Sequence, residues 1–200
     1  MNASKAPYLF VAIFATTLTL TACSDKSATP PASSGSDAAA AVQTPVAADE
    51  MNEPLSTEKV NITLSVAGEP QYKQDEDVLV YRINVANNGK TALVGKGTKP
   101  ILLGVLLVGP EGPDKSPGLR DFVTVPLPLV SIGETKTVEA KLPAKALQGQ
   151  TIQFQLLQGG VSWFDGYGQK PLDTDAFARC KDDASGKTLC NSKGEPVATI

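Results

Sequence analysis

Between Val60 and Leu156 the chain repeatedly alternates apolar and polar residues with a period of two. The first such run, "VNITLSVA" at residues 60–67, places Val, Ile, Leu and Val on one side and Asn, Thr, Ser and Ala on the other. This pattern is typical of a β-strand with one buried face. Further runs of the same kind are found at residues 79–86, 137–142 and 152–156. No segment carries an apolar stripe of helical period over three turns, so the sequence predicts short strands rather than helices.

One later run is apolar on both faces. The run "ILLGVLLV", residues 101–108, is too short to span a membrane, which takes roughly 20 residues. It is predicted to be a central strand buried on both sides, and the alternative is a strand whose outer face is a contact surface. The following "GPEGPDKSPG", residues 109–118, predicts an exposed loop because Gly and Pro interrupt helices and strand ladders. Pro126 and Pro128 then confine the next extended stretch to a sheet edge or an irregular segment.

Six or seven short strands separated by Gly, Pro and Asn turns indicate an all-β fold with a single antiparallel β-sandwich. Two stretches, "INVANNGKT" at residues 83–91 and "VSIGETKTVEAKLP" at residues 130–143, resemble bacterial immunoglobulin-like domains. In those domains one strand ends in Asn-x-Gly and a later strand follows a Gly-Glu-Thr turn. The resemblance implies an immunoglobulin-like sandwich of about seven strands, expected over residues 57–172, and it implies no functional site.

The first 22 residues have the layout of an export signal. Residues 1–5 carry the terminal amine and Lys5, and residues 6–20 are apolar with interspersed threonines. This apolar stretch is shorter than the roughly 20 residues that cross a bilayer. A buried N-terminal helix is the alternative.

The sequence Leu20-Thr21-Ala22-Cys23 resembles the lipobox of bacterial lipoprotein signal peptides. The resemblance implies that residues 1–22 are removed, that the Cys23 thiol receives a diacylglyceryl group and that the freed amine is acylated. With Ser rather than Asp at position 24, it also implies delivery to the outer membrane, facing the periplasm. Because two or more acyl chains anchor a protein stably, Cys23 is expected to hold the chain on a membrane surface without spanning it.

Two polar segments flank the expected sandwich. Residues 23–56 are mostly Ala, Ser, Pro and Thr, with too few large side chains to offset the entropy of ordering, so they are expected to form a disordered tether. Residues 173–200 are expected to form an irregular tail. In an exported chain, Cys180 and Cys190 are predicted to form a disulfide that closes a small polar loop. A metal pair is the alternative, although the spacing is not CxxC and no histidine is present.

The absence of histidine excludes several kinds of chemistry, namely Ser-His-Asp and Cys-His catalysis and the common histidine-containing zinc and copper sites. The chain has 18 basic and 21 acidic residues, so no basic surface is available for nucleic acid. Four aspartates near the end of the chain lack the register of a calcium-binding loop. They are Asp173, Asp175, Asp182 and Asp183. The sequence therefore predicts no catalytic residue, no cofactor and no metal.

Three aromatic residues, Trp163, Phe164 and Tyr167, follow the last predicted strand. They are expected to plug one end of the core, and the alternative is an exposed patch that binds peptide or glycan. Together these features predict a membrane-anchored, non-catalytic binding or accessory module whose partner is an envelope protein. The alternative function is an enzyme or an enzyme inhibitor that acts on envelope polymer through the aromatic and acidic loop at residues 163–175.

Overall fold

The computed structural model describes residues 50–109 and 121–200. All of these residues belong to one folded unit. The predicted signal peptide, the predicted lipidation site Cys23, the tether up to residue 49 and residues 110–118 of the predicted loop lie outside the described residues. Within the two described ranges, no helix is long and apolar enough to cross a membrane.

The first sheet is built around β3 (Val78–Asn87). On one side β3 pairs antiparallel with β6 (Thr135–Pro143) along nearly its whole length. On the other side it pairs antiparallel with β1 (Ile62–Val66) and, further along, with β2 (Gln71–Lys73). β1 and β2 are therefore two halves of one edge strand, interrupted at residues 67–70.

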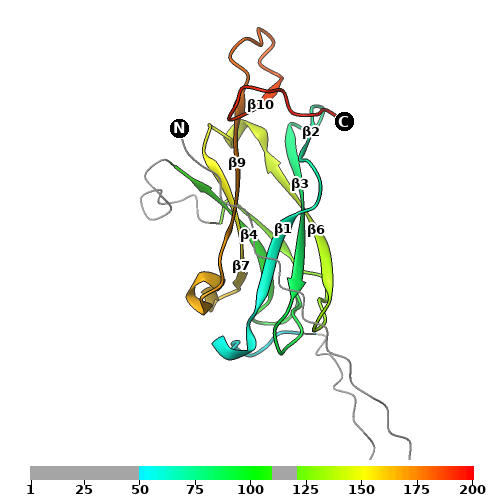
Figure 1. Cartoon of the computed structure of the whole chain (residues 1–200), viewed down its shortest axis with the longest axis vertical. Helices are drawn as coiled ribbons and strands as arrows, with labels where there is room; N and C mark the ends of the chain where they lie inside the picture. Colours follow the sequence, from blue (N-terminus) through cyan, green and yellow to red (C-terminus); the bar gives the residue numbers. More distant parts are fainter. Residues whose placement is uncertain (1–49, 110–120) are drawn as a thin grey trace, which may run out of the picture. The chain divides into compact units, whose positions relative to one another are not determined.

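The second sheet has the strand order β10-β9-β7-β4-β5, and β8 adds to β7. Of these strands, β10, β9, β7 and β4 are labelled in Figure 1. All of these pairings are antiparallel. The strands of this sheet are β4 (Ile101–Val108), β5 (Val123–Pro126), β7 (Thr151–Gln158), β8 (Ser162–Trp163), β9 (Leu172–Arg179) and β10 (Leu189–Asn191). Short 3-10 helices lie in the connections, namely η1 (Thr57–Lys59), η3 (Ala144–Ala146) and η4 (Phe164–Tyr167).

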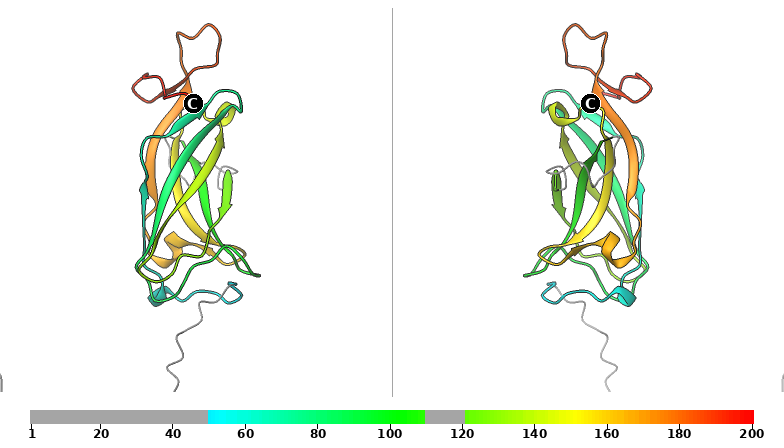
Figure 2. Two further views of the ribbon diagram at one scale, coloured as in Figure 1. Left: turned by 90° about the vertical axis from the view of Figure 1, so that its right-hand side faces the viewer. Right: turned by 90° about the vertical axis from the view of Figure 1, so that its left-hand side faces the viewer.

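The strands of the two sheets run alongside one another (Figure 2). Apolar side chains from both sheets form the core between them. The period of two in the sequence explains this packing. On β3, Leu79, Ile83 and Val85 are fully buried whereas Arg82 is exposed. Each large apolar side chain buried in this way contributes roughly 1.5–3 kcal/mol to the stability of the sandwich.

The predicted antiparallel β-sandwich is confirmed. The order β1-β3-β6 in one sheet and β9-β7-β4-β5 in the other corresponds to strands A-B-E and G-F-C-C′ of the immunoglobulin fold. The described residues contain ten strands rather than about seven. The number is larger because the first edge strand is split into β1 and β2 and because β8 and β10 are added to the second sheet.

The doubly apolar run forms β4, which lies between β7 and β5. Leu103, Val105 and Leu107 are buried in the core, and Leu106, on the opposite face of the strand, is also only 2% exposed. The prediction of a strand buried on both sides is therefore confirmed. β5, which ends at Pro126, is the edge strand next to it, as the prolines predicted.

The folded unit begins before the expected boundary at residue 57. Met51 is buried against the core, and its N–H donates a hydrogen bond of 2.8 Å to the carbonyl of Lys96. The N–H of Leu55 donates a 2.9 Å hydrogen bond to Oε1 of the buried Gln158. These contacts join residues that are far apart in the sequence, so no local alternation of apolar residues predicts them.

The structure also differs from the expected irregular tail at residues 173–200. β9 begins at Leu172, pairs with β7 and completes the second sheet, and β10 pairs with β9 in turn. The sequence of β9, "LDTDAFAR", alternates weakly because most of its side chains are only half-buried. Its strand conformation follows from the hydrogen-bonding edge that β7 offers, a tertiary effect that outweighs local preference.

Candidate functional site

The edge of the first sheet that β1 forms is the starting point of the candidate site. The N–H of Ala67 donates to the carbonyl of Arg82, and the N–H of Asn88 donates to the carbonyl of Asn61, each at 2.8 Å. Because successive residues of a strand turn their peptide groups to opposite sides, the odd-numbered residues of β1 face β3. The even-numbered residues, Leu64 and Val66 among them, therefore direct their N–H and C=O groups away from the sheet.

Both ends of this edge are covered by other parts of the chain. At one end, Oε1 of Gln169 accepts a 2.9 Å hydrogen bond from the N–H of Ile62. At the other end, Tyr72 of β2 donates its N–H to the carbonyl of Ala198 at 2.8 Å and accepts a bond from the N–H of Ile200 at 3.1 Å. Among the described strands, none pairs with the outer side of β1 between these two points.

A groove of about 680 Å³ opens beside this uncovered edge, and we call it the edge groove. One wall is the interruption between β1 and β2, the other wall is β9, and the last residues of the chain close one end. The edge groove is lined by Val66, Gly68, Glu69, Pro70, Tyr81, Thr174, Asp175, Phe177, Asn191, Glu195, Pro196, Val197 and Ala198. It therefore lies between the two sheets, along the side where β1 and β9 are the neighbouring edges.

The deepest lining residues are aromatic. Tyr81 of β3 and Phe177 of β9 are 2% and 3% exposed, and their rings meet edge to face with centroids 6.2 Å apart. Burial raises the pKa of Tyr81 to about 12, and the nearby carboxylate of Asp175 adds to this shift. The phenol therefore stays neutral at physiological pH, so the floor of the edge groove is aromatic and uncharged.

The rim of the edge groove is acidic. Glu69, Asp175 and Glu195 line it, and none of the described lining residues is Lys or Arg. Asp175 accepts a hydrogen bond from the N–H of Ala176, and Glu195 accepts one from Nδ2 of Asn191, each at 2.9 Å. Across residues 50–109 and 121–200, no three carboxylate or cysteine side chains converge on a point where a metal ion could be held. The carboxylates of the rim therefore give this surface a negative charge but, among the described residues, form no metal-binding site.

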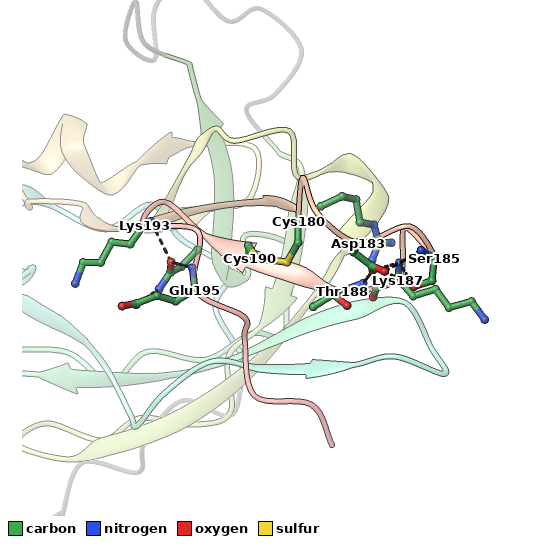
Figure 3. The surroundings of a disulfide bond; sticks show 10 residues. Cys180, Asp183, Ser185, Lys187, Thr188, Cys190, Lys193 and Glu195 are labelled. Atoms are coloured by element: carbon green, nitrogen blue, oxygen red, sulfur yellow. Dashed lines mark hydrogen bonds between the residues drawn. A yellow bond between two sulfur atoms is a disulfide. The ribbon is translucent and has the colours of Figure 1, made fainter.

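The predicted disulfide between Cys180 and Cys190 is confirmed, with a Cα–Cα distance of 5.1 Å. It links the end of β9 to β10 (Figure 3). The loop that it closes is organised by Asp183, whose carboxylate accepts hydrogen bonds from the N–H groups of Ser185, Lys187 and Thr188. The Ser185 hydroxyl also donates to this carboxylate, and this bond, together with those from the N–H groups of Thr188 and Ser185, lowers the pKa of Asp183 far below its usual range, so the carboxylate remains charged.

The residues that follow the disulfide-linked strand β10 form one side of the edge groove. Asn191 at the end of β10 donates its N–H to the carbonyl of Glu195 at 3.0 Å, and Val197 donates to the carbonyl of Leu189 at 2.9 Å. The chain therefore folds back along β10 before it reaches β2. β10 is joined to β9 both by backbone pairing and by the disulfide, and Glu195 follows β10 in this segment.

A second polar cluster joins the two sheets near the same end. Arg179 of β9 forms an ion pair with Asp77, which precedes β3, and also donates a 2.7 Å hydrogen bond to the hydroxyl of Tyr72. The Tyr72 hydroxyl in turn donates to Asp77 at 2.7 Å. This hydrogen bond, with help from Arg179, lowers the pKa of the Asp77 carboxyl. The three side chains bond to one another, so the cluster joins the two sheets.

The three predicted aromatic residues separate into different environments. Phe164 is fully buried in the core, and Tyr167 packs on it edge to face at 5.3 Å. Trp163 is half-buried on the outer face of the second sheet, against the backbone of Gly104. The three rings therefore do not form one common exposed patch, and Phe164 is the core plug that the sequence favoured.

The edge groove itself was largely missed by sequence reasoning. Asp175 belongs to the four aspartates that lack a calcium-binding register and to the alternative loop site predicted at residues 163–175, but the sequence patterns do not single out Tyr81, Glu69 or Glu195 as site residues. One signal was available in "AGEP" at residues 67–70, which interrupts the alternation between β1 and β2. The approach of β9 and of the last residues to that interruption is a tertiary arrangement with no local signature.

No protein-family model matches the chain, and no curated protein matches it. Among solved structures, the chain is similar to the crystal structure of the "Putative ApaA Protein from Bordetella pertussis". The two share 15% sequence identity over 58% of this chain and 89% of that chain, with a TM-score of 0.24. A likeness this weak carries no information about function.

Proposed function

We propose that this chain is a bacterial envelope lipoprotein, anchored through acylated Cys23, whose sandwich binds an envelope protein and catalyses no reaction. The anchor is supported by the resemblance of residues 20–23 to a lipobox. Ser24 supports placement in the outer membrane, facing the periplasm. The binding surface in this proposal is the edge groove.

The observation that carries the binding function is the combination of an uncovered strand edge with a groove at its side. Immunoglobulin-like sandwiches host many functions, so the site and not the fold must support the proposal. Here the outward peptide groups of Leu64 and Val66 adjoin an aromatic floor and an acidic rim. Concave apolar surfaces with a few polar groups at the rim are typical of binding sites.

Apart from Thr174 and Asp175 of β9, which line the edge groove, residues 163–175 do not form the proposed binding surface. Phe164 lies in the core, and the carboxylates of Asp165 and Asp173 make hydrogen bonds within this segment or to β7. Asp165 accepts from the N–H of Gly166 at 2.8 Å, and Asp173 accepts from Nε2 of Gln153 at 2.7 Å.

The anchor is tested by replacing Cys23 with Ala in cells fed a labelled fatty acid. The wild-type chain is expected to carry the label and to fractionate with membranes, whereas Cys23→Ala is expected to do neither. Ser24→Ala is the matched control, since it changes the adjacent residue and keeps the thiol. A labelled Cys23→Ala chain, or an unlabelled wild-type chain, would disprove the anchor.

The binding surface is tested by placing a photo-crosslinking amino acid at position 69 of the full chain in living cells. Glu69 lies on the rim of the edge groove, so it is expected to crosslink to one discrete envelope protein. Position 132 is the control, because Ile132 is 59% exposed and does not line the groove. Crosslinking that is absent at position 69, or equal at both positions, would contradict the proposed surface.

A further inference from the structure

The outer edge of β1 offers the row of hydrogen-bonding groups that an added strand needs. We propose that an extended segment of the partner protein pairs with β1 as an extra strand and places a Lys or Arg side chain at the acidic rim of the edge groove. This inference rests on the proposed binding function and names the mode of binding and the chemistry of the bound segment.

The first support is the direction of the peptide groups. Leu64 and Val66 turn their N–H and C=O groups outward, and no described strand pairs with them there. An uncovered strand edge is a template for another extended chain, and many peptide-binding domains use such an edge. Backbone hydrogen bonds would supply the attachment, and side chains would supply the selectivity.

The second support is that the same edge already accepts an added segment from this chain. Thr199 forms a parallel bridge with Tyr72, flanked by the hydrogen bonds of Tyr72 to Ala198 and Ile200. The last residues of the chain thus extend the first sheet outward at β2 (Figure 1). The edge is therefore geometrically able to hold a strand just before that point.

The length of the uncovered stretch sets the length of the segment. It runs from Leu64, beyond the Gln169 contact, to Gln71, where β2 begins next to the C-terminal residues. Residues 67–70 interrupt the strand, so the length is measured on the opposite residues of β3, which run from Val85 to Val80. At roughly 3.3 Å per residue this stretch covers about 17 Å, and an extended segment of about five residues fits it.

The side chains of the groove define the chemistry of that segment. Alternate side chains of an added strand face the groove, where Tyr81 and Phe177 form an aromatic floor. Glu69, Asp175 and Glu195 surround this floor with negative charge, and none of the described lining residues is cationic. A segment that carries a β-branched apolar residue at one groove-facing position, with Lys or Arg two residues before and two residues after it, is complementary to both the floor and the rim.

Charge also argues against two occupants from the chain itself. The predicted tether at residues 23–49 carries one lysine and three aspartates, so its net charge has the same sign as the rim. A second copy that paired its β1 with this β1 would bring two acidic rims together, because such a contact is symmetric. A basic segment of a different protein meets neither repulsion.

The mode of binding is tested with the full-length lipidated protein in detergent micelles and a fluorescein-labelled peptide, Thr-Lys-Thr-Val-Thr-Lys-Thr, which as a strand carries both Lys side chains and the Val side chain on one face. A peptide with Glu in place of Lys is expected to bind at least about tenfold more weakly, because like charges then meet at the rim. A peptide N-methylated at alternate residues, so that it cannot donate to β1, is expected to show no binding. Equal affinity of either modified peptide, or no binding of the Lys peptide at millimolar concentration, would overturn the proposal.

Val66→Pro provides the matched test on the protein side. The N–H of Val66 points outward, so proline removes a donor to the added strand without breaking a bond to β3. This variant is expected to lose at least about tenfold in affinity for the Lys peptide. Val66→Thr, which keeps the N–H, is expected to bind within about twofold of the wild type. If Val66→Pro does not fold, the N-methylated peptide carries the same test.

The outcomes separate this inference from the proposed function. Crosslinking from position 69 in cells, combined with peptide affinity that is unchanged by N-methylation and by Val66→Pro, would support the binding function and disprove strand addition. Loss of both crosslinking and peptide binding would disprove both. Sedimentation of the wild type as a dimer that Val66→Pro converts to a monomer would show a second copy as the occupant and would also overturn the inference.

Discussion

Arg179 on β9 and Asp77 before β3 form an ion pair that joins the two sheets at the end of the sandwich where the C-terminal segment pairs with β2. Asp77 adopts a left-handed backbone conformation, with φ at 53°, which Asn and Gly also tolerate well. The Tyr72 hydroxyl hydrogen-bonds to both charged groups, and the Arg179 guanidinium lies 5.6 Å from the centre of the Tyr72 ring. The cluster therefore couples the two sheets and the edge strand β2 at one point.

Asp77→Asn is expected to lower the free energy of unfolding by about 0.5–1 kcal/mol, because it removes the charge and keeps the left-handed conformation. The estimate is small since both side chains are about one-third exposed. The difference between wild type and variant should depend on pH. The pKa of Asp77 is lowered in the folded state, so the stabilisation is present above the ordinary carboxyl pKa and is lost as the pH falls through the lowered value.

Urea unfolding at several pH values measures this effect. Glu76→Gln is the neighbouring control, because Glu76 pairs with Lys73 and Lys141 on the open surface and is expected to contribute little. A wild-type advantage over Asp77→Asn that persists unchanged into strong acid would show that the ion pair is not its source.

Removal of the disulfide is expected to lower the free energy of unfolding by roughly 2–3 kcal/mol, the amount that the chain-entropy model assigns to a loop of this size. The variant Cys180→Ser with Cys190→Ser is compared with the wild type by urea unfolding, and a thiol titration of the unreduced wild type should find neither cysteine free. Because β10 carries the chain back toward β2, the amide of Ile200 should exchange faster in the variant. Unchanged exchange would show that the C-terminal pairing does not depend on the bond.

The strands of this sandwich could be predicted from the sequence wherever a strand has one buried face and one solvent-exposed face. The alternations that define β1, β3, β6 and β7 correspond to Leu64, Ile83, Val138 and Phe154 pointing into the core. The two-sided run of β4 was likewise predicted, because no polar residue interrupts it. In each case local pattern and tertiary burial demand the same structure.

The parts that escaped prediction depend on partners distant in the sequence. β9 is a strand because β7 offers it an edge, and Met51 is buried because Lys96 and Lys99 hydrogen-bond to its backbone. The edge groove has the same origin, since Glu69, Asp175 and Glu195 are separated by long stretches of chain and meet only in the fold. A single sequence contains no periodicity that links such residues.

Gly104→Ala is expected to destabilise the protein by about 1–3 kcal/mol, because a Cβ at this position would lie 2.5 Å from ring atoms of Trp163 and 2.7 Å from Leu157. The cost should fall when Trp163 is also replaced by Ala, since the clash with the ring is then removed. The two single variants and the double variant together give the coupling energy. Trp163 is the chain's single tryptophan, so its fluorescence reports ring displacement directly. Additive costs would mean that the ring does not pack on Gly104.

Gln158→Leu is expected to detach residues 51–56 from the rest of the folded unit. It is expected to lower the free energy of unfolding by about 1–3 kcal/mol, because it leaves buried backbone groups without hydrogen-bond partners. Oε1 of Gln158 accepts from the N–H of Leu55 at 2.9 Å, and Nε2 donates to the carbonyl of Glu53 at 2.8 Å. Amide exchange at Leu55 and proteolysis near residue 53 should both accelerate, while the amides of β4 remain protected. Gln153→Leu on the same strand is the control, since its amide bonds to the exposed Asp173. Equal acceleration in the two variants would mean that residues 51–56 respond to general loss of stability and are not held by Gln158.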